Sequence, residues 1–331
     1  MKFLKLLIYF CLPAFVWAQD GSDTYGFLRL PSSAHVSALG GYNVSLVELD
    51  PSTAFHNPAL MGGEMDGMIS VNYLNYIADV NAGSAIFTKA YKERGTIGVG
   101  ATYINYGETK EASLENVVLG TFGAQDMSMQ VIYAYDLTDK WRGGLSLKAL
   151  YSVLVDYSSF GLAVDAGLSY FDTEKDLSFG VALKNVGAQL KAYNTERQNV
   201  PWDLQMGFTK RLAHAPLRIS LTGIYLNRWK LDYLDRTVTE LNESFLQTAV
   251  KHLVLGVDFV PSDNFWIGIG YNPKTKEDMK LTTRSALGGF SAGAGIKVSR
   301  FNIGVSYAQY HPSASSLMVG VTMRLFNNEA F

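Results

Sequence analysis

Cysteine is almost absent from this sequence. The only one among the 331 residues is Cys11, inside an apolar stretch near the N-terminus. Ile8, Tyr9 and Phe10 precede it, whereas a lipoprotein acylation site needs small residues next to its cysteine, so we do not expect lipidation. The rest of the chain can form no disulfide bond, no thiolate metal site and no thiol nucleophile.

Neither sign of charge is in excess. Lys and Arg number 28 and Asp and Glu 30, which gives a formal net charge of −2. No basic block could hold a nucleic acid, so we expect no nucleic-acid partner. Long hydrophobic runs are also missing after the N-terminal stretch, and a membrane-spanning helix would need about 20 apolar residues in a row.

Catalytic and metal-binding motifs are missing too. The five histidines are scattered, without a metal-ligand spacing such as His-x-x-x-His. Ser262-Asp263-Asn264 matches one element of the penicillin-binding transpeptidases, but Ser-x-x-Lys and Lys-Thr-Gly do not occur, so we interpret it as a turn. No glycine pair continues as Gly-x-Gly-x-x-Gly. We therefore expect no enzyme, no cofactor and no metal site.

The N-terminus has the pattern of an export signal. Lys2 and Lys5 give a basic start, and an apolar stretch follows at residues 6–16. Val16-Trp17-Ala18 then offers the groups that a signal peptidase reads, so we place cleavage after Ala18. Residues 1–18 are predicted to be a secretory signal peptide.

What the chain has in abundance is alternation. Near its end the apolar residues are Leu317, Val319, Val321, Met323 and Leu325, with Gly320, Thr322 and Arg324 between them. A period of two is that of a strand with one apolar and one polar face. Together with 19 Tyr, 18 Phe and 31 Gly, it is typical of a membrane β-barrel, in which the apolar face meets lipid and the polar face lines the lumen.

About fourteen such segments follow one another, an even number as in single-chain bacterial barrels. The predicted strands are Gly67–Tyr76, Asn81–Lys89, Thr96–Tyr106, Asp126–Asp136, Trp141–Leu154, Ser158–Phe171, Asp176–Gln189, Trp202–Arg211, Leu217–Trp229, Val250–Val260, Phe265–Asn272, Leu287–Lys297, Phe301–Tyr310 and Ser316–Phe326. We expect residues 67–331 to form an antiparallel transmembrane β-barrel.

The lengths of the connections support this prediction. Every even-to-odd connection is short, whereas the long ones are all odd-to-even: Gly107–Gln125, Leu190–Pro201, Lys230–Ala249 and Pro273–Ala286. Outer-membrane barrels have short periplasmic turns and longer external loops. We therefore expect an outer-membrane protein with extracellular long loops and periplasmic termini.

Residues 19–66 do not alternate. Ser33 to Gly41 is predicted to be a short helix with a glycine stop, and Asp50-Pro51 to begin a capped helical turn. The segment is too short for a domain with its own core. It either plugs the lumen or lies against the periplasmic mouth, and Asn57-Pro58-Ala59 is either simple punctuation or a contact that seals or gates the lumen.

Charged residues occupy lumen-side positions in several predicted strands. They are Lys148, Asp165, Lys184, Arg218, Asp258, Lys297 and Arg324. An Arg or Lys that faced lipid at mid-depth would cost about 2–4 kcal/mol, so we expect these side chains to point inward. Such charges are more often structural than substrate-binding.

One long connection has helical spacing. Leu241, Phe245 and Leu246 belong to a pattern that runs through Thr239–Val250. The helix either caps its own loop or offers a docking face to an external partner.

A family resemblance rests on the segment before the first strand. Phe27-Leu28-Arg29-Leu30-Pro31-Ser32-Ser33-Ala34, Ala38-Leu39-Gly40-Gly41 and Phe55-His56-Asn57-Pro58-Ala59 resemble the start of the PorV/PorQ group, which belongs to the wider FadL-like outer-membrane barrels. Ser70 to Tyr76 in the first strand adds to it. The resemblance covers the mature chain in layout and is specific in its first sixty or so residues.

The resemblance implies a structural role in the type IX secretion system. Such a barrel would anchor the surface protein PorZ in an attachment complex with PorU and PorV, which processes secreted cargo and attaches it to lipopolysaccharide. Two alternatives stay open. One is a FadL-like channel for hydrophobic small molecules, and the other is a soluble periplasmic binding module.

Overall fold

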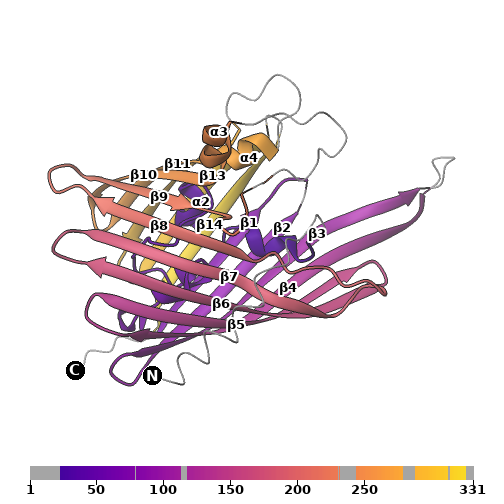
Figure 1. Ribbon diagram of the computed structural model, residues 1–331, viewed down its shortest axis with the longest axis horizontal. Coiled ribbons are helices and arrows are strands. Elements are labelled where there is room, and N and C mark those ends of the chain that lie inside the picture. The colour runs from indigo at the N-terminus through magenta and orange to yellow at the C-terminus, as the bar shows by residue number, and fades with distance from the viewer. Residues whose placement is uncertain are drawn as a thin grey trace.

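The computed structural model describes residues 23–78, 80–112, 118–229, 231, 244–278, 288–311 and 314–325. The expected signal peptide, with its cleavage point, lies outside the described residues. The described chain forms a closed barrel in which each strand pairs antiparallel with its neighbours in sequence, and β1 (Met68–Asn75) pairs with β14 (Ala314–Arg324) to close the ring (Figure 1). The prediction of a fourteen-stranded antiparallel barrel is confirmed.

The remaining strands lie close to their predicted positions. They are β2 (Asn81–Tyr91), β3 (Gly95–Ala112), β4 (Val118–Asp136), β5 (Trp141–Leu154), β6 (Tyr157–Asp172), β7 (Leu177–Lys191), β8 (Asp203–Arg211), β9 (Leu217–Gly223), β10 (Leu253–Ser262), β11 (Phe265–Tyr271), β12 (Phe290–Val298) and β13 (Phe301–His311). The short connections gather at one end of the barrel, here the turn end, where β1 begins and β14 ends. The opposite end is the loop end.

Two predicted connections at the loop end were wrong in part. Residues 107–125 were expected to form a loop, but β3 and β4 continue as a hairpin that projects beyond the neighbouring strands (Figure 1). Outside the membrane neither face of a hairpin needs to be apolar, so strand pairing continues there without the alternation that marks a lipid-facing strand. Strand β9 ends at Gly223 rather than Trp229, and α3 (Phe245–Lys251) precedes β10.

A second helix at the loop end, α4 (Pro273–Asp278), lies in the long connection predicted at Pro273–Ala286, for which no helix was predicted from the sequence. Helices α3 and α4 lie side by side above the barrel wall (Figure 1). None of the helices within the described part of the chain is long and apolar enough to span a membrane.

The outer surface of the barrel is apolar, with aromatic residues near both ends. Trp141 packs on Tyr170 at the turn end, with 5.0 Å between ring centroids. Tyr151 and Tyr157, at the loop end of the same hairpin, are 43% and 57% exposed. Trp141 and Tyr151 are ten residue steps apart. At about 3.3 Å per step along a strand tilted by about 40°, they lie about 25 Å apart across the barrel, which is the height of the apolar band of outer-membrane barrels.

Residues 23–66 fill the lumen and are called the plug (Figure 1). Its short helices are η2 (Gly26–Arg29), α2 (Ala34–Ala38), η3 (Pro51–Phe55), η4 (Pro58–Leu60) and η5 (Gly63–Met65). Ser33, Asp50 and Asn57 cap α2, η3 and η4 by accepting hydrogen bonds from backbone N–H groups. Every residue from Pro51 to Gly62 is buried, so the plug lies within the barrel and not against its mouth.

Candidate functional site: the plugged lumen

The plug crosses the lumen from one end to the other. Asp23, its first described residue, forms a bridge with Asn199 in the loop-end connection between β7 and β8. The hydroxyl groups of Tyr25 and Ser159 lie 2.6 Å apart near the same end. The Ser178 hydroxyl donates to the Ser45 carbonyl near the turn end. The plug thus contacts the wall along the length of the barrel.

Asn57, Pro58 and Ala59 lie at the centre of this packing. The Asn57 side chain is fully buried; its Nδ2 donates to the Val44 carbonyl at 2.8 Å, and its Oδ1 accepts from the Ala59 N–H at 3.0 Å. The tripeptide therefore ties two passes of the plug together and starts η4. Its sealing or gating role stays a prediction.

Glycines in the wall allow the plug to approach this closely. A Cβ atom at Gly144 of β5 would lie 2.5 Å from the Ala59 nitrogen, and one at Gly180 of β7 would collide with the Val44 carbonyl oxygen. Gly270 of β11 faces the backbone of Gly40 in the same way. Backbone of the plug thus packs directly on backbone of the wall, as the strand glycines allow.

A charged network fixes α2 to the wall. The two ring nitrogens of His35 lie 2.6 Å from Glu48 Oε2 and 3.0 Å from Asp258 Oδ1, and Arg218 Nε donates to Asp258 Oδ2 at 2.9 Å. The imidazole stacks on the Trp266 ring, with centroids 3.6 Å apart and an interplanar angle of 2°. Four charges from the plug, β9 and β10 therefore neutralise one another inside the barrel.

The two buried histidines of the plug have opposite protonation preferences. Burial alone would lower the pKa of His35, but the carboxylates of Glu48 and Asp258 raise it to about 9. Burial lowers the pKa of His56 well below its usual value, and the ammonium groups of Lys184 and Lys148 add to this. His56 Nε2 accepts the Ser32 N–H at 3.3 Å, which a neutral ring can do.

The lumen-side charges predicted from the sequence contribute to this packing. Lys148 Nζ lies 2.6 Å from Asp165 Oδ2 and donates to Asn185 Oδ1 at 2.8 Å. Both members of the Lys148–Asp165 pair are buried, as is Lys184. An ion pair in this position holds the wall together and leaves no charge facing lipid.

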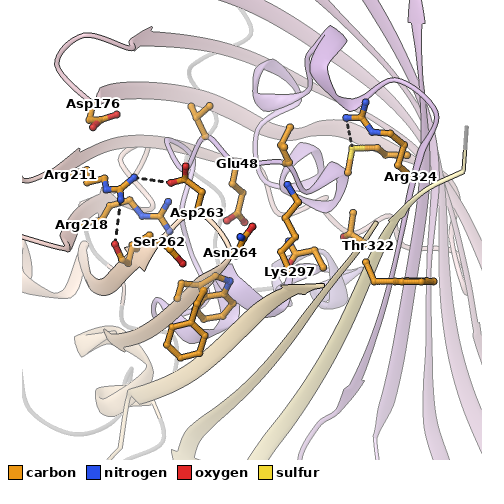
Figure 2. Close-up of a pocket in the computed structure, with 18 of the residues that line it drawn as sticks. Glu48, Asp176, Arg211, Arg218, Ser262, Asp263, Asn264, Lys297, Thr322 and Arg324 are labelled. Atoms are coloured by element: carbon orange, nitrogen blue, oxygen red, sulfur yellow. Dashed lines mark hydrogen bonds and ion pairs between the residues drawn. The ribbon is translucent and has the colours of Figure 1, made fainter. Parts of the chain in front are cut away.

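The turn end of the lumen opens into a cavity of about 1030 Å³, here called the vestibule (Figure 2). Glu48 and Leu49 of the plug form part of its lining, and Lys297 and Arg324 reach it from β12 and β14. Asp263 and Asn264, from the predicted turn motif, lie in the connection between β10 and β11 and line it too.

The loop end has a smaller cavity of about 280 Å³, lined by Tyr42 and Tyr225 among others. Between the two, cavities along the plug measure about 10, 20 and 30 Å³. Such volumes have room for two water molecules at most, whereas an engineered cavity that takes up benzene measures about 150 Å³. The plug in this conformation leaves little space for an organic solute beside it.

The predicted docking residues lie at the loop end, in part. Phe245 and Leu246, at the start of α3, are 70% and 71% exposed, while Leu241 lies outside the described residues. Phe245 stacks on Trp229, with ring centroids 4.8 Å apart, and Trp229 stacks on His252. The partner-docking role of these residues stays a prediction.

Sequence reasoning missed the His35 network and the vestibule. His35 and Glu48 gave no local signal, because the network depends on a contact with Asp258, 223 positions away in sequence. The searched portion of the chain contains no group of three or more His, Cys, Asp or Glu side chains that could hold a metal ion.

Comparison with known proteins supports the fold alone. No protein-family model matches the chain, and no curated protein matches its sequence. Solved structures do match. A FadL homologue of Pseudomonas aeruginosa is 11% identical, with 92% of this chain and 100% of the other chain covered and a TM-score of 0.53. The Pseudomonas putida toluene transporter TodX is 10% identical, with 92% of this chain and 98% of the other chain covered and a TM-score of 0.53.

The monoaromatic hydrocarbon channel CymD also matches, at 13% identity, with 91% of this chain and 97% of the other covered and a TM-score of 0.50. The chain therefore has the fold of FadL-like outer-membrane barrels.

Proposed function

We propose that this protein is a plugged outer-membrane barrel that anchors a surface partner, as a PorQ-like component of the type IX secretion system. The observation that carries the proposal is the packing of the plug, whose central residues are buried against glycines of the wall. A filled lumen suits a scaffold better than a passage, and an anchored partner needs only the exposed loop end.

An outer-membrane location is part of this proposal. The apolar band of about 25 Å between Trp141 and Tyr151 matches the hydrocarbon region. The outward side chains of Leu145 and Leu147, between these aromatic residues, are 57% and 58% exposed, as expected for a lipid-facing surface. On this proposal the loop end faces outward and the turn end faces the periplasm, because long loops are external in such barrels.

The surface patch formed by Trp229, Phe245 and Leu246, here the loop-end patch, is the proposed docking site. Phe245 and Leu246 are largely exposed, Trp229 is about half exposed, and the two aromatic rings stack on one another. Exposed aromatic and leucine side chains are typical anchors of a protein–protein contact. The partner would be a PorZ-like surface protein, with PorU, PorV and lipopolysaccharide in the same assembly.

A pull-down of the tagged protein from outer membranes in mild detergent tests the proposal. We expect a surface protein such as PorZ to be recovered with the wild type and lost with the double variant Phe245→Asp, Leu246→Asp. The matched control is Leu145→Ala, an outward wall residue away from the patch. Recovery of the barrel alone, with normal heat-modifiable migration on a gel, would contradict the anchoring role.

A second candidate function is a channel for hydrophobic small molecules. The likeness of fold to TodX and CymD favours it. It requires the plug to rearrange, because the cavities beside it hold only water-sized species. Uptake of radiolabelled toluene and of a long-chain fatty acid, compared between cells with and without the protein, separates the two: accelerated uptake would replace the anchoring proposal with this one.

A further inference from the structure

One wall of the turn-end vestibule carries three cationic side chains that form no salt bridge with a carboxylate of the described residues. Lys297 lies one residue before the end of β12, Arg300 lies in the following turn, and Arg324 ends β14, and all three line the vestibule. The backbone N–H of Arg324 donates to the Arg300 carbonyl at 3.4 Å. Lys297 of β12 lies opposite Asn302 of β13, which in turn lies opposite Thr322 of β14. Three cations thus lie on one wall, at the turn end of β12 and β14 and in the turn between β12 and β13, here called the cationic wall.

Arg324 is near enough to Asp66 to help lower the pKa of that carboxyl, but it forms no salt bridge with it. Within the described ranges no Asp or Glu oxygen lies within 4 Å of the charged groups of Lys297, Arg300 or Arg324. Arg324 instead donates to the backbone carbonyl of Glu64 at 2.7 Å, and the Glu64 carboxylate binds Arg142. The charge of the wall is therefore directed at whatever fills the vestibule.

The opposite wall is balanced. Arg211 pairs with Asp263 at 3.1 Å, and Arg218 pairs with Asp258 at 2.9 Å. Figure 2 shows Arg211, Arg218 and Asp263 on one side of the vestibule, with Asp176 beside them, and Lys297, Thr322 and Arg324 on the other. The vestibule is therefore polarised, with positive charge outside any described salt bridge on the β12–β14 side.

Size and lining point to a chain segment as the occupant. The vestibule measures about 1030 Å³, at the upper end of the range of about 300–1,000 Å³ for small-molecule sites. Its lining combines the cations with the amides of Asn264 and Asn302 and the rings of Phe265 and Phe301. The side-chain amides can hydrogen-bond to the backbone of a bound peptide, and the phenyl rings can pack on its side chains. A simple anion offers neither a backbone nor side chains for these contacts.

The plug makes the vestibule a dead end. Val47, Glu48 and Leu49 line it on the plug side, and the cavities beyond them have room for two waters at most. An occupant enters from the turn end and leaves by the same route. The Glu48 carboxylate at the plug side also opposes a compact, multiply charged anion, whereas an extended segment can keep its acidic groups at the cationic wall.

We propose that the vestibule docks an acidic peptide segment of a protein located on the turn side of the membrane. The carboxylates of the segment pair with Lys297, Arg300 and Arg324, and its backbone contacts Asn264 and Asn302. This partner is separate from the surface partner proposed above, because it binds at the opposite end of the barrel. The two proposals can therefore fail independently.

Binding of a defined probe tests the inference. The full-length mature protein is placed in phosphatidylcholine nanodiscs, which expose both ends, and titrated with a fluorescein-labelled decapeptide of alternating glutamate and serine. Fluorescence anisotropy should show saturable binding that the double reversal Lys297→Glu, Arg300→Glu weakens by about tenfold or more. Lys92→Glu, an exposed turn residue at the same end and outside the vestibule, should leave binding unchanged.

Two further measurements keep the test independent of the folding of the variants. A photo-crosslinkable version of the probe should label wild-type residues around Lys297, Asn302 and Arg324, as mapped by mass spectrometry. The lysine–serine counterpart should not bind, and inorganic phosphate at the same charge concentration should compete poorly. Labelling elsewhere, equal binding of both peptides, or displacement by phosphate as effective as by unlabelled peptide would overturn the proposal.

Discussion

The charge of His35 depends on residues from three different parts of the chain. Its ring lies between Glu48 of the plug and Asp258 of β10, and it stacks on Trp266 of β11. Inside the barrel a protonated imidazole satisfies both carboxylates, whereas a neutral ring would leave a buried negative charge uncompensated. The attachment of the plug therefore depends on the protonation of one side chain.

Thermal stability should consequently depend on pH in a defined window. The His35 pKa rises from 6.5 to about 9 on folding, so its contribution, about 3 kcal/mol by linkage, is fully present below pH 6.5 and is lost as pH rises through about 9. His56 has a lowered pKa, so its contribution is present above pH 6.5 and is lost as pH falls below that value. Stability is then greatest near pH 6.5 and falls on both sides, on the alkaline side steadily up to about pH 9.

Thermal midpoints of the detergent-purified protein, followed by circular dichroism from pH 5 to 10.5, measure this window. His35→Gln should be less stable at pH 7.5 and should lose the alkaline decline while keeping the acidic one. An alkaline decline of the same size in wild type and variant would show that other groups cause it.

The strands show how far local pattern determines structure. Strand β5, which runs from Trp141 to Leu154, has the bounds expected from alternation, because a lipid-facing strand shows its period in the residues themselves. The extension of β3 and β4 to residues 112 and 118 was missed, since a hairpin outside the membrane carries no such period. The position of the plug in the lumen could not be predicted from the sequence either, because it depends on contacts between distant residues, such as that of His35 with Asp258 of β10.

The close packing of η4 against β5 leads to a prediction about a glycine of the wall. In Gly144→Ala, the new Cβ would lie 2.5 Å from the Ala59 nitrogen, so η4 must shift, which we expect to cost about 1–3 kcal/mol. Gly83→Ala in β2 is the control, because its nearest atom would be 3.9 Å away. A lower temperature of heat-modified migration for Gly144→Ala than for Gly83→Ala is the expected result. Equal temperatures would show that the plug is not packed on the wall at this point.

The whole molecule combines an outer surface suited to lipid with a lumen closed from within. The sequence indicated two distinct ends of the barrel, because all of its long connections follow odd-numbered strands. In the structure, helices α3 and α4 lie at the loop end, opposite the short turns (Figure 1). What the sequence could not indicate was whether residues 19–66 lie inside the barrel or against its mouth, and the structure places the described residues 23–66 inside it. That depends on the fit of plug backbone to wall glycines such as Gly144 and Gly180.

Single-channel recording in planar lipid bilayers tests most directly whether the plug closes the lumen. The full-length mature protein should insert without steady conductance, because the cavities beside the plug have room for two waters at most. A variant in which residues 23–61 are replaced by a short Gly-Ser linker should give a large, steady conductance through the emptied barrel. Steady conductance by the full-length protein, or equal conductance by the two proteins, would contradict the account.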